Sequence, residues 1–179
     1  MKKVIPLMAM TAFSLPVMAT EPGTFYGALG GGAYQIDSSG FDETAPSANV
    51  LGGYNLSERF AIEGAYTRLF DAEGKVDNIG VEISGNVWEL STKMTVPVGN
   101  RFNSYGRLGW SYLDLKAVTV SNEFPGRANG YDDAFTWAMR AGYELKPRLS
   151  LNGEYGQIQI DGGDLERLSF SLNYQFGSH

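Results

Sequence analysis

The chain closes with the stretch LSFSLNYQF, residues 168–176, in which apolar and polar residues alternate without interruption. One parity, meaning one set of every second residue, holds only apolar side chains: Leu168, Phe170, Leu172, Tyr174 and Phe176. The other parity holds only Ser, Asn and Gln. Because successive side chains of a strand point to opposite faces, the stretch predicts a strand with one apolar face and one polar face.

Seven further segments have the same period of two. They are residues 24–35, 49–56, 60–70, 87–96, 102–115, 135–145 and 149–158. In 87–96, Trp88 and Leu90 alternate with Glu89 and Ser91. Most segments are longer than the usual five or six residues of a globular strand, and have the length that a tilted strand needs to cross a bilayer. We therefore expect eight amphipathic antiparallel strands.

The connections between these segments alternate in length. Short turns follow the second, fourth and sixth segments, around Ser57, Gly99 and Pro147. The other connections, residues 35–48, 71–85, 116–134 and 161–166, are long and rich in Asp and Glu. Tight turns at one end and long acidic loops at the other are typical of a barrel inserted into a membrane from one side.

Two closed barrels fit eight amphipathic strands. A soluble ligand-binding barrel places the apolar parity inside, whereas a membrane barrel turns it toward lipid. The polar parity here is mostly small and uncharged, unlike a water-facing surface, and aromatic side chains lie near segment ends. The fold class predicted is therefore all-β: an eight-stranded antiparallel up-and-down transmembrane β-barrel.

A membrane barrel places the charges of the polar parity in a narrow lumen. These are Glu63, Glu89, Lys93, Arg107, Arg140, Glu144 and Glu154. Their signs nearly cancel, and most lie at similar heights above the short turns, so we expect an ionic network across the lumen. If Leu145 lies opposite Leu149, antiparallel counting also places Arg140 opposite Glu154.

The N-terminal residues indicate the cellular compartment of the protein, and its composition limits the chemistry and the partners that it can have. Residues 1–19 have a basic start, an apolar stretch and small residues before a cleavage site after Ala19, as a secretory signal peptide does. The 179-residue chain has no cysteine and a net charge of −6, so thiolate chemistry is excluded and nucleic acid is not an expected partner. We expect the barrel over residues 20–176 and a tail over 177–179.

Together, the signal peptide, the FYGALGGGAY opening (25–34) and the closing LSFSLNYQF resemble the small outer-membrane barrels of Gram-negative bacteria. Examples are the OmpA transmembrane domain, OmpX and the neisserial surface protein NspA. The resemblance implies insertion by the outer-membrane assembly machinery, which in this family reads the C-terminal strand. Tyr174 and Phe176 match its last two apolar positions, although Ser171 replaces the usual glycine and three residues follow Phe176.

Catalysis is not expected. Lipid A-modifying barrels of this size use histidine, and the only histidine here is His179, the last residue. Asp161 and Asp164 are weak candidates for a divalent cation, and a solvated acidic loop is the preferred interpretation. No cofactor is expected.

The sequence thus favours a non-enzymatic monomer in the Gram-negative outer membrane, surrounded by lipid and lipopolysaccharide. It would serve envelope structure or surface contact through acidic loops, with a lumen closed by the ionic network. A narrow pore for ions or very small solutes is the alternative, and a soluble periplasmic ligand-binding barrel is a third possibility.

Overall fold

A computed structural model describes residues 21–38, 41–76, 79–99, 101–120, 127–160 and 163–177. The expected signal peptide, residues 1–19, lies outside them, as do Asp161 and His179. The strands are β1 (Phe25–Ser38), β2 (Phe41–Asn55), β3 (Phe60–Val76), β4 (Ile79–Pro97), β5 (Phe102–Val120), β6 (Arg127–Lys146), β7 (Leu149–Ile160) and β8 (Gly163–Phe176).

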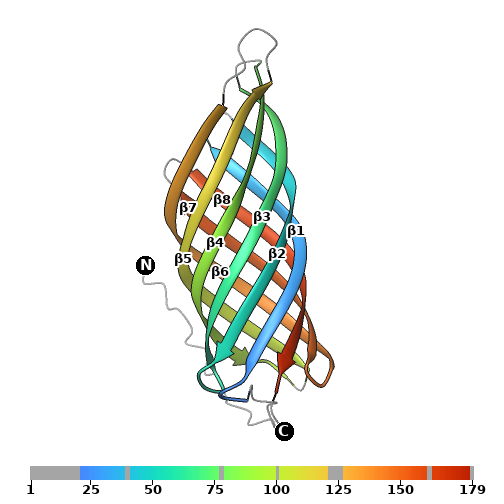
Figure 1. The fold of residues 1–179 in the computed structure, drawn as a ribbon. Helices are drawn as coiled ribbons and strands as arrows, with labels where there is room; N and C mark the ends of the chain where they lie inside the picture. The colour runs from blue at the N-terminus through green and yellow to red at the C-terminus, as the bar shows by residue number, and fades with distance from the viewer. Residues whose placement is uncertain are drawn as a thin grey trace, which may run out of the picture.

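The strands form one closed barrel in which each pairs antiparallel with its neighbours in the sequence, and β8 closes the sheet against β1 (Figure 1). Closure leaves no unpaired sheet edge, as a barrel in lipid requires. The predicted fold class, an eight-stranded up-and-down antiparallel barrel, is confirmed. Within the described residues no helix is long and apolar enough to span a bilayer.

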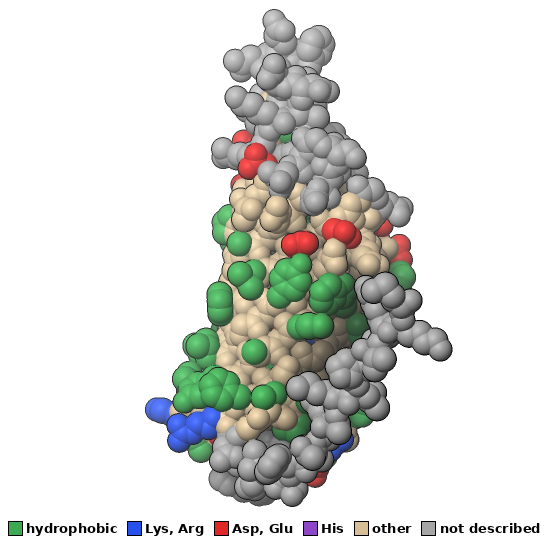
Figure 2. Space-filling view, turned by 180° about the vertical axis from the view of Figure 1, so that it is seen from behind, with side chains coloured by type: hydrophobic (Ala, Val, Ile, Leu, Met, Phe, Trp, Pro, Cys, Tyr) green, Lys and Arg blue, Asp and Glu red, His purple; other side chains and the backbone are tan. Residues whose placement is uncertain are grey.

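The apolar parity faces outward, as predicted from the closing strand. Leu168, Phe170, Leu172, Tyr174 and Phe176 are all exposed on β8. Trp88, Leu108 and Met139 are exposed on other strands of the barrel. On the face shown in Figure 2, hydrophobic side chains form a belt around the middle of the barrel, with acidic side chains above it and basic ones below. An apolar belt on the outside of a closed sheet is the surface that lipid covers.

The two ends of the barrel differ in their connections. At the end where β1 begins and β8 ends, here called the turn end, residues 56–59, 98–101 and 147–148 join neighbouring strands (Figure 1). Arg148 closes the last of these turns in the left-handed region, with φ of 74°. At the opposite loop end, only residues 39–40, 77–78, 121–126 and 161–162 separate the strands.

The prediction of long polar loops was wrong for most of their residues. Ile36, Ala45, Ala72 and Leu165 were assigned to connections, but all four are buried on strands. The strands therefore run from 12 to 20 residues. They extend past the outer apolar belt because apolar side chains pack inside the barrel there. This packing stabilises the pairing of neighbouring strands even where the outer face is polar.

The inward side chains form three levels. Near mid-height they are charged or polar, and toward the loop end they are apolar. Toward the turn end the lumen opens into a cavity of about 280 Å³. Glycines make room at the wall: a Cβ on Gly53 would overlap the ring of Tyr26, so only glycine accommodates that tyrosine.

Candidate functional site

The barrel lumen is crossed near mid-height by a buried cluster that we call the ionic layer. It consists of Glu63, Glu89, Lys93, Arg107, Arg140, Glu154 and Arg167. These residues come from β3 to β8, and every one of them is buried. Each lies on the inward parity of its strand, so the closed sheet points all seven side chains toward the axis.

Glu63 on β3 is the most connected acid. Its carboxylate lies 3.5 Å from Arg107 Nη1, 3.4 Å from Arg140 Nη1 and 3.7 Å from Lys93 Nζ. The Tyr26 hydroxyl donates to Glu63 Oε1 over 2.6 Å. With no solvent exposure, this carboxylate depends on these partners for the stabilisation that water would give.

Arg140 and Glu154 form the closest pair of the layer. Arg140 Nε donates to Glu154 Oε2 over 2.7 Å, and Arg140 Nη2 lies 2.5 Å from the same oxygen. The two residues are directly opposite each other in the β6–β7 ladder. Leu149 pairs with Lys146 and not with Leu145 as expected, but a bulge between Glu144 and Lys146 restores the register that the counting used.

Arg107 links the two halves of the layer. Its Nη2 lies 3.0 Å from Glu154 Oε1 and 2.6 Å from Glu89 Oε1. Arg167 Nη2 donates to Glu89 Oε2 over 2.8 Å, and Arg167 Nη1 donates to the Thr67 hydroxyl. The acids and bases thus form a continuous chain of charge-assisted contacts around the lumen.

The membership of the layer differs from the predicted set at two residues. Glu144 lies nearer the turn end, where it lines the cavity, and no ion pair among the described residues includes it. Arg167 was missed because the closing segment was read from Leu168. Its parity, shared with Ser169 and Ser171, is the signal that identifies it as inward.

A second barrier was not anticipated. Toward the loop end the lumen is filled by a cluster here called the apolar layer: Tyr34, Ile36, Ala45, Leu69, Ala72, Val87, Leu113, Ala134, Ile158 and Leu165. Leu69, Leu113, Ile158 and Leu165 have no solvent exposure. The Tyr34 hydroxyl donates to the Phe70 carbonyl over 2.6 Å, where the β3–β4 register shifts.

The remaining predicted residues belong to neither layer. Tyr174 and Phe176 face outward on β8, opposite Gly27 and Phe25 of β1. Asp164 lies at the start of β8, and within the described ranges no three His, Cys, Asp or Glu residues gather as metal ligands do.

Solved structures share this architecture. The chain aligns with the outer membrane protein OprG of Pseudomonas aeruginosa at a TM-score of 0.66 and 14% identity, covering 90% of this chain and 100% of that one. Neisserial surface protein A aligns at 0.64 and 14%, covering 85% and 97%. Ail, the attachment invasion locus protein of Yersinia pestis, aligns at 0.63 and 11%, covering 87% and 100%. At these identities the likeness concerns the fold alone.

Comparison of the amino-acid sequence with known proteins and protein families identifies the family. No curated protein matches the chain. A family model described as the outer membrane protein beta-barrel domain matches residues 5–176, which is nearly the whole chain. The chain therefore belongs to the outer membrane protein beta-barrel domain family.

Proposed function

We propose that this protein is a non-enzymatic, monomeric barrel of the Gram-negative outer membrane, with a sealed lumen. It would contribute to envelope structure and to contact at the cell surface through its loop end. The observation that carries this proposal is the ionic layer, whose side chains from six strands meet at the axis and are all buried.

The ionic layer opposes the passage of solutes because its charged groups already use one another as partners. An ion that crossed it would need to break contacts such as the one between Arg140 and Glu154, in a region from which water is largely excluded. A lumen built for conduction instead presents charged groups to water along an open path. This arrangement supports a scaffold more than a channel.

The apolar layer opposes ions in a different way. Leu69, Leu113 and Leu165 offer no polar groups that replace the hydration of an ion, and their packing leaves no exposed surface inside the barrel. Two barriers of different chemistry therefore lie in series along the same lumen. Opening one of them leaves the other in place.

The outer surface supports lipid as the surrounding partner. Aromatic side chains such as Phe60, Phe102 and Phe176 are exposed near the turn end, and basic Arg59 and Arg101 lie directly beyond two of them. Aromatic rings prefer the level of the headgroups, and the basic groups complement lipid phosphates. At the loop end, acidic side chains such as Asp133 would meet lipopolysaccharide or surface partners.

Insertion by the outer-membrane assembly machinery belongs to the same proposal. Tyr174 and Phe176 on the last strand present their rings outward, with ring centroids 5.2 Å apart. They also lie on the seam where β8 pairs with β1. A machinery that reads this strand would meet both rings on one side before the barrel closes.

Planar-bilayer conductance tests the sealed lumen. The wild-type protein is expected to give no current steps. Arg140→Ala is also expected to stay silent, because the apolar layer remains. Arg140→Ala combined with Leu113→Ala and Leu165→Ala should conduct, whereas Arg140→Ala with the outward Leu108→Ala should not. Current steps from the wild-type protein would contradict the proposal.

The pore alternative rests on one observation, the cavity of about 280 Å³ that enters the lumen from the turn end. Tyr26 and Lys93 line its inner part, so the cavity reaches the ionic layer. A pore would need that cavity to continue past both layers. Steady wild-type conductance that rises in Arg140→Ala would favour this second function.

A further inference from the structure

The ionic layer carries more positive than negative charge. Its bases are Lys93, Arg107, Arg140 and Arg167, and its acids are Glu63, Glu89 and Glu154. One formal positive charge is therefore in excess inside a low-dielectric lumen. An unbalanced buried charge is costly unless a counter-charge or polar groups stabilise it.

The excess charge is least compensated at Lys93. Among the described residues its ammonium has one ion pair, with Glu63 Oε1 at 3.7 Å, which is longer than the 2.7–2.9 Å usual for charge-assisted hydrogen bonds. The ammonium otherwise lies over the ring of Tyr26, 4.0 Å from its centroid, and 5.1 Å from that of Tyr105. Lys93 is only 5% exposed, so bulk water does not stabilise it fully.

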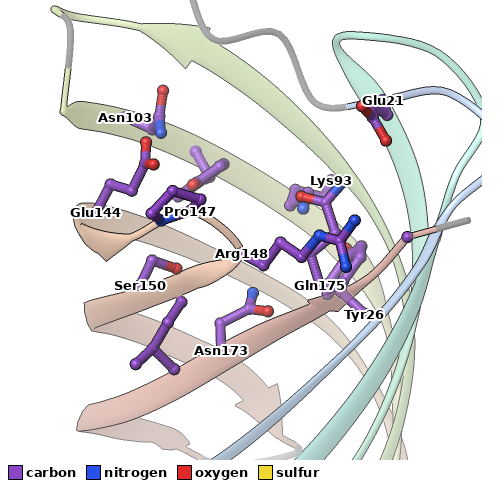
Figure 3. A pocket seen from close by; sticks show the side chains of 13 residues that line it. Glu21, Tyr26, Lys93, Asn103, Glu144, Pro147, Arg148, Ser150, Asn173 and Gln175 are labelled. Atoms are coloured by element: carbon purple, nitrogen blue, oxygen red, sulfur yellow. The ribbon is translucent and has the colours of Figure 1, made fainter. Parts of the chain in front are cut away.

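Lys93 faces the turn-end cavity. The cavity of about 280 Å³ is lined by Lys93, Tyr26 and Tyr105, with Arg148 at its mouth (Figure 3). Figure 3 shows the Arg148 side chain running from the β6–β7 turn toward Gln175. Its guanidinium lies beside Gly177, where an added Cβ would approach Nη2 to 3.3 Å.

Neutral polar groups complete the lining. Asn103, Ser150, Asn173 and Gln175 supply amide and hydroxyl groups. Two acids are also present, Glu21 and Glu144, but both lie toward the mouth: Glu21 precedes β1, and Glu144 is two residues from the end of β6. Lys93 lies deeper, because it is four residues from the end of β4 and pairs with Arg107 of the ionic layer. The inner end of the cavity is therefore cationic, and its mouth has charged groups of both signs.

We propose that the turn-end cavity binds a small oxyanion of the carboxylate or phosphate class, with the Lys93 ammonium as its inner contact. The volume lies just below the range of ligand pockets, which suits a small solute. The anion would balance the layer's excess charge, and amide and hydroxyl donors would fix its remaining oxygens. This inference adds a binding site to the proposed scaffold.

Titration of the folded protein in detergent tests the site. Sodium acetate and sodium phosphate are added in separate series at constant ionic strength, with sodium chloride as the third series. The backbone amide shifts of Asn173 and Gln175 are followed by NMR. We expect saturable shifts with acetate or phosphate, and the series that saturates identifies the class.

Two variants and one control link the shifts to Lys93. Lys93→Met should weaken binding by about tenfold or more, since it removes the charge-assisted contact. It leaves three bases and three acids in the layer, so the barrel should still fold. Arg148→Gln, which leaves the layer intact, should weaken binding less. Lys116→Met, at an exposed lysine of β5, should leave the affinity for the anion unchanged.

The proposal is overturned if no series saturates in the wild-type protein, or if Lys93→Met binds as tightly as wild type while heat-modifiable migration shows it folded. If Lys93→Met fails to fold, unchanged binding by Arg148→Gln overturns it instead. The titration reports on the cavity whether or not the lumen conducts. A conducting wild-type protein would refute the sealed scaffold and leave the anion site to be judged by this experiment.

Discussion

The ionic layer and the apolar layer both consist of inward side chains of the same lumen, the first from β3 to β8 and the second from all eight strands, yet they close it by opposite means. In the ionic layer, Glu63 is held by directional contacts with three bases and a tyrosine hydroxyl. In the apolar layer, Leu113 and Leu165 are held by packing alone. Charged contacts fail when one partner is removed, whereas packing fails in proportion to the volume removed.

The largest effect is expected from Glu63→Gln. The substitution keeps the shape of the side chain but leaves Lys93, Arg107 and Arg140 facing a neutral group, so the layer's excess positive charge doubles. We expect a loss of about 3–5 kcal/mol in the free energy of unfolding, measured by urea titration in lipid vesicles.

The exposed Glu58→Gln in the β2–β3 turn is the matched control for Glu63→Gln, and it should shift stability by less than about 0.5 kcal/mol. Equal stability of Glu63→Gln and wild type would show that the ionic layer is held by something other than its carboxylates.

Leu113→Ala tests the apolar layer by the same measurement. Removing this side chain leaves a cavity among Leu69, Ile158 and Leu165, and we expect a loss of about 3 kcal/mol. Leu108→Ala on the same strand, which faces lipid, should cost about 0.5 kcal/mol. If the two substitutions have equal effects, the packing of the apolar layer contributes no more to stability than contact with lipid does.

A double-mutant cycle measures the coupling free energy of one ion pair of the ionic layer. Arg140→Ala and Glu154→Ala each leave a charge without its closest partner, whereas the double variant removes both. The coupling is expected to be about 1–3 kcal/mol. The cycle of Arg140→Ala with Glu58→Ala should show coupling near zero, and an uncoupled Arg140–Glu154 pair would contradict the contact that the structure gives.

The smallest effect is expected from Arg167→Met. It removes the donor to Glu89 and Thr67 but also the layer's excess positive charge, and Arg107 remains beside Glu89. The net loss should be about 1 kcal/mol, in the same unfolding titration. Arg101→Met at an exposed turn serves as the control. A loss as large as that of Glu63→Gln would mean that the charge excess has no cost.

Much of the barrel could be predicted from alternation. The parity of Leu168–Phe176 identified the lipid face, and counting from the short β6–β7 turn led to the Arg140–Glu154 pairing that the ladder contains. This succeeded because the period of two is local, and because an antiparallel register near a short turn depends on few residues.

The apolar layer could not be predicted in the same way. Ile36, Ala45 and Leu165 lie among acidic residues, so composition favoured loops, and the alternation there has apolar side chains on the inward parity. The rule that the polar parity faces inward holds only at the height of the lipid belt. Beyond it, water replaces lipid outside, and the pattern reverses as in a soluble barrel.

The contacts of the ionic layer also bear on how the barrel assembles. Thr67 and Arg167 are 100 residues apart in the chain, and Glu63 receives Arg140 from 77 residues away. A growing sheet that lacks β7 and β8 would hold Arg107 and Arg140 without Glu154, and Glu89 without Arg167. Glu154 brings its ion pairs only with β7, and Glu89 meets Arg167 only with β8, so the layer favours completion of the sheet and penalises a barrel closed in the wrong register.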